Sequence, residues 1–201
     1  MGRPEGHYPL RSAGRLITLR DTAWDTYVQQ SNGPIIIGPW RGELGFEVLY
    51  WLPYLLAWRR RLKIASRRIH VITRGGMGAF YAAQQCLDLY DLATLEACRL
   101  ATATEHQRTK MLKQTRVTAF DRQIIEKAAA HWKLTRPHVL HPSRMFRDLA
   151  PWWEDRGHFR ALAAQTCYDP LPAPDLPAGW TLPTSYVAVR FYARATFPPA
   201  V

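Results

Sequence analysis

One short stretch constrains the fold of this chain more than any other. The apolar run Ile35–Ile37 is followed by a glycine-containing turn and then by an aromatic-rich run that ends near Arg61. Three β-branched residues in a row are typical of a strand that is buried on both faces. The glycines predict a turn, and the apolar stripe that follows predicts a helix. A strand, a turn and a helix in this order form the first unit of a parallel α/β sheet.

Two later segments repeat this order. Ile69–Thr73 is an apolar strand that leads into a glycine turn, and Val139–His141 is a short apolar strand that leads into a proline and a serine. Helices are expected over Ala79–Leu89, Val117–Trp132, Arg144–Leu149 with Ser143 as its cap, and His158 to Cys167. Strands joined through helices pair in parallel. We therefore expect an α/β fold with a Rossmann-like parallel sheet and flanking helices, and these three strands as neighbours.

The predicted organisation has four parts. Residues 1–30 are polar and are interpreted as an N-terminal extension, which could include a short strand at Arg15–Leu19. Residues 31–168 form the Rossmann-like domain, and residues 169–184 are a proline-rich linker. Residues 185–201 begin with a strong strand pattern. They are either the last strand of the first sheet or the start of a truncated second domain, and we favour the second interpretation.

Composition limits the partners and the location. The chain has 201 residues and a net charge of +11, which favours anionic partners such as nucleic acid, anionic lipid or phosphorylated small molecules. Its three cysteines show no C-x-x-C spacing, which argues against a disulfide framework and against a cysteine zinc site. We expect a cytoplasmic protein without a metal or cofactor. The longest apolar run, Val48 to Trp58, is much shorter than the roughly 20 residues of a membrane span. Peripheral contact with a membrane remains open.

The polar residues that could form a site lie where the predicted strands end. Glu43 and Glu47 are four residues apart in the turn after the first strand, so in a helix they would share one face. A carboxylate near a helix N-terminus is stabilised as the anion, so we expect Glu47 to be ionised at neutral pH. The other candidate residues at these junctions are Trp40, Arg41, Gly42, Gly45, Arg74, Gly75, Gly76, His141 and Ser143. Glycines let the backbone approach a ligand, while the aromatic residues and the histidine could equally belong to the core.

One part of this region resembles a known family. The residues from Leu44 to Leu55 resemble the first strand–helix junction of GT-B glycosyltransferases of the heptosyltransferase type, which have Leu-Gly-Asp and then an apolar helix with a proline in its second turn. Here Glu47 stands in the place of that aspartate, and Phe46 is an extra residue. The strand pattern after the proline-rich linker also resembles the start of the second domain in two-domain glycosyltransferases, including fucosyltransferase-like ones.

The resemblance implies an inverting, metal-independent transfer of a sugar. The donor would be a nucleotide sugar and the acceptor a glycan or a phosphorylated molecule, with this chain as the acceptor-side half and the donor-binding half beyond Val201. Glu47 would act as the general base, with Glu43 as second choice, and Arg41 and Arg74 would meet phosphates. Two alternatives remain: a non-catalytic Rossmann-like binding domain, and a basic nucleic-acid-binding protein. The chain has no zinc-finger, RRM or KH signature, so nucleic acid is not the expected partner.

Overall fold

The structure, a computed structural model, describes residues 21–81, 83, 85–109, 113–154 and 159–169. Four strands form one sheet in the order β3-β2-β1-β4, with all neighbours parallel. The strands are β1 (Ile35–Ile37), β2 (Ile69–Thr73), β3 (Gln85–Asp88) and β4 (His138–Leu140). This confirms the predicted α/β, Rossmann-like fold and the parallel pairing of the three predicted strands. The expected strand at Arg15–Leu19, nearly all of the proline-rich linker and residues 185–201 lie outside the described residues.

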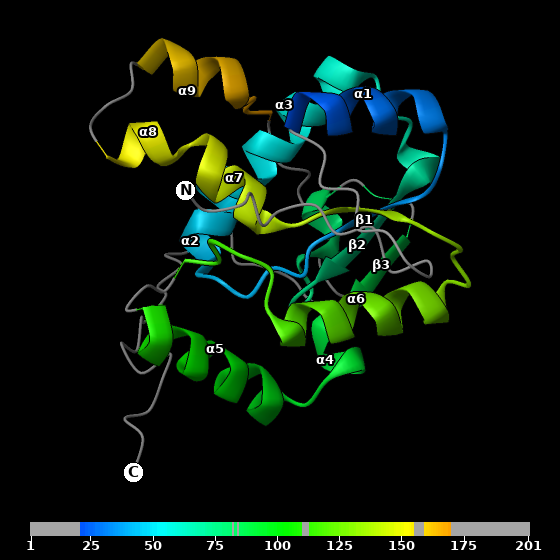
Figure 1. Cartoon of the computed structure of the whole chain (residues 1–201), viewed down its shortest axis with the longest axis vertical. Helices are drawn as coiled ribbons and strands as arrows, with labels where there is room; N and C mark the ends of the chain where they lie inside the picture. Colours follow the sequence, from blue (N-terminus) through cyan, green and yellow to red (C-terminus); the bar gives the residue numbers. More distant parts are fainter. Residues whose placement is uncertain (1–20, 82, 84, 110–112, 155–158, 170–201) are drawn as a thin grey trace, which may run out of the picture.

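Helices cover both faces of the sheet (Figure 1). They are α1 (Asp21–Ser31), α2 (Leu44–Phe46), α3 (Leu52–Leu62), α4 (Leu89–Leu92), α5 (Leu95–Thr109), α6 (Ala119–His131), α7 (Pro142–Asp148), α8 (Ala150–Trp153) and α9 (Phe159–Gln165), with a π-helical turn η1 (Glu47–Trp51) and the 3-10 turns η2 (Ser66–Arg68) and η3 (Met77–Tyr81). Within the described part of the chain, no helix is both long enough and apolar enough to cross a bilayer.

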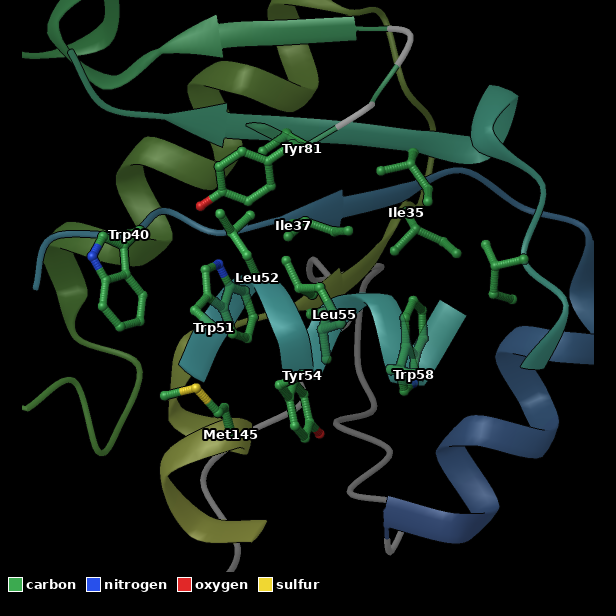
Figure 2. Packing of buried hydrophobic residues seen from close by; sticks show 14 of the residues in the cluster. Ile35, Ile37, Trp40, Trp51, Leu52, Tyr54, Leu55, Trp58, Tyr81 and Met145 are labelled. Atoms are coloured by element: carbon green, nitrogen blue, oxygen red, sulfur yellow. The ribbon is translucent and has the colours of Figure 1, made fainter. Parts of the chain in front are cut away.

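The alternation of side chains along β1 divides the core into two layers. Ile35 and Ile37 point into a large cluster with buried side chains of α1, α3, α7 and α9. Ile36 points the other way, into a cluster with side chains of α4, α5 and α6. All three isoleucines are buried, as expected for a strand with helices on both faces. One stripe of the aromatic-rich run lies in the first cluster (Figure 2). It consists of Trp51, Leu52, Leu55 and Trp58.

Three local predictions are wrong. The segment expected as a helix over Ala79–Leu89 instead contains the end of η3 and strand β3, which pairs with β2. Residues 21–31 were assigned mostly to an extension but form α1, because Trp24 and Val28, four residues apart, are both buried in the core. The cap of α7 is His141, whose side chain accepts from the Ser143 N–H, so Ser143 lies inside the helix.

The helical run from Leu44 to Leu62 is interrupted by the π-helical turn η1, which ends at Trp51. Proline has no N–H, so it is tolerated in the first turn of a helix, and here Pro53 is the second residue of α3. Any residue other than proline at position 53 would have an N–H group that could donate to the Leu49 carbonyl. Here the Leu49 carbonyl accepts a hydrogen bond from the Tyr168 hydroxyl at 2.9 Å. The Pro53 carbonyl in turn accepts from the Cys167 N–H. The segment after α9 therefore fastens the helical run at its irregular point.

Gly38 shapes the turn that leads from β1 towards the site. Its φ of +104° is one that L side chains rarely adopt, and a Cβ at this position would lie 2.7 Å from the Ile72 carbonyl oxygen of β2. Its N–H donates to the Leu140 carbonyl of β4. Only glycine lets the chain leave the sheet so close to both neighbouring strands.

Candidate functional site

Glu47 is the carboxylate at the centre of the candidate site. It opens η1, just after β1 and its turn, and its side chain is fully buried, at 0% exposure. The Tyr81 hydroxyl, at the end of η3, donates to Glu47 Oε1 at 2.5 Å. Oε2 has no hydrogen-bond partner among the described residues. The two turns that follow β1 and β2 thus meet at the carboxyl edge of the sheet, where parallel α/β folds bind ligands.

The environment of Glu47 changes its ionisation. Burial raises the pKa of this carboxyl group to about 7, although the Tyr81 hydrogen bond and the positive charge of Arg74 both act to lower it. Burial, together with the nearby Glu47 charge, also raises the pKa of Tyr81 well above its usual range, so this phenol remains a donor. At neutral pH Glu47 is therefore only partly ionised, in contrast to the expectation of a fully ionised carboxylate, because the loss of hydration outweighs the Tyr81 hydrogen bond and the charge of Arg74. A carboxyl group with this pKa can both take up and release a proton near neutral pH.

Glu43 and Glu47 do not share a helix face. Glu43 is exposed and has extended backbone angles as the residue before α2, and its side chain caps no N–H group. Its backbone carbonyl accepts from the Glu47 N–H and from the indole N–H of Trp40. The two acids therefore lie in different environments, one in water and one in the core.

Arg41 is committed to a buried ion pair. Its Nε lies 2.8 Å from Asp121 Oδ1 and its Nη2 lies 3.3 Å from Oδ2, with the two side chains 4% and 0% exposed. A third contact runs from Nη1 to the Thr102 hydroxyl, and Gln114 accepts from the Arg41 N–H. Burial acts to raise the pKa of Asp121, but His141 and Arg41 hold it well below its usual range. The Arg41 guanidinium is therefore already paired with Asp121, so it is not available for the predicted contact with a phosphate.

His141 and Ser143 are buried beside the same ion pair. His141 Nδ1 accepts from the Ser143 N–H at 3.1 Å, which places the ring proton on Nε2, 3.5 Å from Asp121 Oδ2. The Ser143 hydroxyl is buried and has no hydrogen-bond partner among the described residues. His141 thus acts as a helix cap next to Asp121 and does not point its proton at the Glu47 carboxyl group.

Arg74 is a cation at this edge of the sheet that remains available to a ligand. It follows β2 and is partly exposed, and no hydrogen bond or ion pair joins its side chain to another described residue. Its charge acts on Glu47. Gly75 and Gly76 follow with φ of +57° and +81°, and a Cβ at either would meet open space. The Gly76 N–H already donates to the Asp88 carboxylate. In this turn the Arg74 side chain is therefore more available to a ligand than the Gly76 N–H is.

The other predicted binding residues have structural surroundings. Trp40 is fully buried and stacks on Trp51 and Phe146, so it belongs to the core (Figure 2). A Cβ at Gly42 would lie 2.9 Å from the Trp40 ring, which explains the glycine by packing. A Cβ at Gly45 would meet nothing within 4 Å, so this glycine is not required by its neighbours.

Two important residues were not predicted from the sequence. Tyr81 lies in a segment that was assigned to a helix, and no short pattern marks it as the partner of Glu47. Asp121 carries a recognisable signal, because with Thr118 it forms a capping box at the start of α6. That pattern predicts a helix start and does not reveal the pair with Arg41.

Comparisons of the chain with protein-family models, with curated protein sequences and with solved structures found no match. Among the residues that the structure describes, no group of three or more His, Cys, Asp or Glu side chains is arranged to hold a metal ion.

Proposed function

We propose that the carboxyl edge of the sheet transfers a sugar from a nucleotide-sugar donor to a hydroxyl group, with Glu47 as the general base. One observation carries the proposal: Glu47 is a buried carboxyl group with a pKa of about 7 and one oxygen, Oε2, that has no hydrogen-bond partner among the described residues. Carboxyl groups with such a pKa are found preferentially at functional sites, because they exchange protons near neutral pH.

In this mechanism Tyr81 and Glu47 have separate roles. The Tyr81 hydroxyl holds Oε1 and fixes the plane of the carboxylate. The acceptor hydroxyl donates to Oε2, and Glu47 takes its proton while the acceptor oxygen forms a bond to the anomeric carbon and the nucleotide diphosphate leaves. Since Glu47 is fully buried in this state, the acceptor reaches Oε2 only after a local rearrangement opens a path to this oxygen, while Tyr81 keeps its hydrogen bond to Oε1. Catalytic hydrogen bonds commonly form only once the ligand is bound.

Arg74 supplies the binding of the anionic part of a ligand. Its partly exposed side chain is not paired with another described residue, and guanidinium groups bind phosphate through two parallel hydrogen bonds. Arg41 is excluded from this role by its pair with Asp121. Because the positive charge of Arg74 acts on Glu47, a phosphate bound to Arg74 would also lie close enough to influence the Glu47 carboxyl group electrostatically.

The test is the release of nucleotide from a panel of nucleotide sugars, with and without hydroxyl acceptors, by a protein that joins this chain to the donor-binding half implied by the resemblance, as wild type and as Glu47→Gln. Loss of a general base typically lowers the rate by 10²–10⁴-fold, so turnover should fall by at least about a hundredfold. Glu43→Gln is the matched control, since it removes an exposed carboxylate four positions away, and it should retain most of the activity. Full activity of Glu47→Gln, or no turnover of any donor by the two-domain wild type, would remove the assignment.

A further inference from the structure

One end of the molecule carries large apolar side chains that the core does not cover. Leu49 of η1 is 57% exposed, Phe159 of α9 is 69% exposed, and Tyr168, after α9, is 61% exposed. Trp152 and Trp153 of α8 are half-buried and pack on the edge of the core, and the Trp152 ring lies 6.2 Å from the Phe159 ring. We call these five residues the apolar surface. Figure 1 shows α8 and α9 side by side at the upper left of the molecule.

The members of the apolar surface are connected. The Tyr168 hydroxyl donates to the backbone carbonyl of Leu49 at 2.9 Å, which holds α9 and η1 together. The next residue of η1, Tyr50, packs its ring edge-on against Trp153 at 5.4 Å. Other large apolar side chains are also exposed, among them Tyr27 of α1 and Leu100 of α5. The apolar surface differs in that its members are linked in pairs, Tyr168 with Leu49 and Trp152 with Phe159, and a cluster of this kind indicates a binding surface.

Positive side chains border the apolar surface. Lys113 Nζ lies 4.6 Å from the centre of the Trp153 ring. Arg60 is more than half exposed and donates to the Cys167 sulfur and to the Asp169 carboxylate, on either side of the exposed tyrosine. Asp169 neutralises part of that charge, but the chain as a whole carries +11.

We propose that the apolar surface docks on an anionic lipid membrane, independently of the Glu47 site. Tryptophan and tyrosine favour the boundary between lipid headgroups and acyl chains, because their rings are apolar and their polar atoms remain hydrated. Leu49 and Phe159 would enter the acyl boundary, while Lys113 would meet lipid phosphates. The strong excess of positive charge distinguishes this partner from another copy of the same chain, which would be repelled.

Vesicle flotation tests the proposal with pure phosphatidylcholine and with vesicles that contain about 30% phosphatidylglycerol. The wild-type chain should partition at least about tenfold more strongly onto the anionic vesicles than onto the neutral ones. High salt should reduce this difference. The tryptophan emission of the bound chain should shift to the blue. The double variant Leu49→Glu with Phe159→Glu should lower the partition coefficient at least about tenfold. Leu100→Glu is the matched control: it is 68% exposed but lies on α5, which packs on the opposite face of the sheet, so its binding should be unchanged.

Three results would overturn the proposal. The first is a wild-type chain that stays unbound on anionic vesicles. The second is an equal loss of binding in the Leu100→Glu control, which would indicate a non-specific effect of negative charge. The third is a wild-type chain that self-associates in gel filtration but does not bind vesicles, together with a double variant that no longer self-associates. The apolar surface would then bind another protein chain. Circular dichroism melting checks that each variant is folded before it is compared.

Discussion

The Tyr81 hydroxyl and Glu47 Oε1 lie 2.5 Å apart and join the turn after β2 to the turn after β1. This hydrogen bond stabilises the charged form of Glu47, but less strongly than burial disfavours it, so the pKa of the carboxyl group is raised to about 7. A buried acid in this balance connects the protonation of the site to the stability of the whole fold.

The first prediction is a fall in stability with rising pH. The unfolded chain binds the Glu47 proton with the ordinary pKa of 4.5 and the folded chain with a pKa of about 7. Between these values the folded state holds the proton more tightly, so the free energy of unfolding should decrease as pH rises from 4.5 to 7, by about 3 kcal/mol from this group. Urea unfolding at a series of pH values measures it.

Glu47→Gln should remove this part of the pH dependence and should be more stable than wild type at pH 8, because its side chain stays neutral. Glu43→Gln should follow the wild-type curve, since its carboxylate is exposed. The same slope in Glu47→Gln as in wild type would show that another group titrates.

The second prediction concerns the buried ion pair. Asp121→Asn leaves the Arg41 guanidinium buried without a negative partner, which typically costs 3–5 kcal/mol of stability. The matched control is Glu105→Gln, which weakens the more exposed pairs with Arg116 and Arg108 and should cost at most about 1 kcal/mol. Chemical denaturation of both variants at pH 7 compares them. If both variants lost a similarly small amount of stability, the Arg41 guanidinium would have to be hydrated once Asp121 is replaced by a neutral residue.

The third prediction separates two glycines. Gly38→Ala should destabilise the fold by roughly 2 kcal/mol or more, because its φ is +104° and the new methyl group would meet the Ile72 carbonyl. Gly45→Ala lies in α2 with open space around the Cβ, so it should be neutral or stabilise by up to about 1 kcal/mol. Thermal unfolding of the two variants should therefore shift in opposite directions or by clearly different amounts.

The fourth prediction tests the capping box of α6. Thr118 accepts from the Asp121 N–H, and Asp121 Oδ2 accepts from the Thr118 N–H. Thr118→Ala should lower stability by about 1–2 kcal/mol, and Thr118→Ser should recover most of it. In combination with Asp121→Asn the losses should not add, because both changes remove the same contacts. Simple additivity in a double-mutant cycle would contradict a shared network.

The sequence predicted the parts of the fold that are uniformly apolar. β1, β2 and β4 are buried on both faces, so their composition identifies them. β3 was missed because its side chains are exposed or half-buried, which admits Gln85 and Asp88. β4 lies at the other edge of the sheet but is buried, so its composition still marks it. A strand with exposed side chains needs little apolar composition, and composition alone does not distinguish it from a helix.

The site was predicted in position but not in its electrostatics. The turn after β1 could be read from its glycines and acids, which placed Glu47 at the carboxyl edge of the sheet. Its burial could not be read, because it depends on Tyr81, 34 positions away. Arg41 was assigned to a ligand because its partner, Asp121, lies 80 positions later. Residue type alone does not distinguish a cation that binds a ligand from one that is already paired.

The strand order has a consequence for the synthesis of the protein. β1 lies between β2 and β4, so one side of its backbone is unpaired until β4, about 100 residues later, has left the ribosome. At a synthesis rate of roughly 5–20 residues per second, the apolar edge Ile35–Ile37 is open to other chains for several seconds. The central strand, which is the best protected in the finished fold, is thus the most vulnerable to misassembly in the nascent chain.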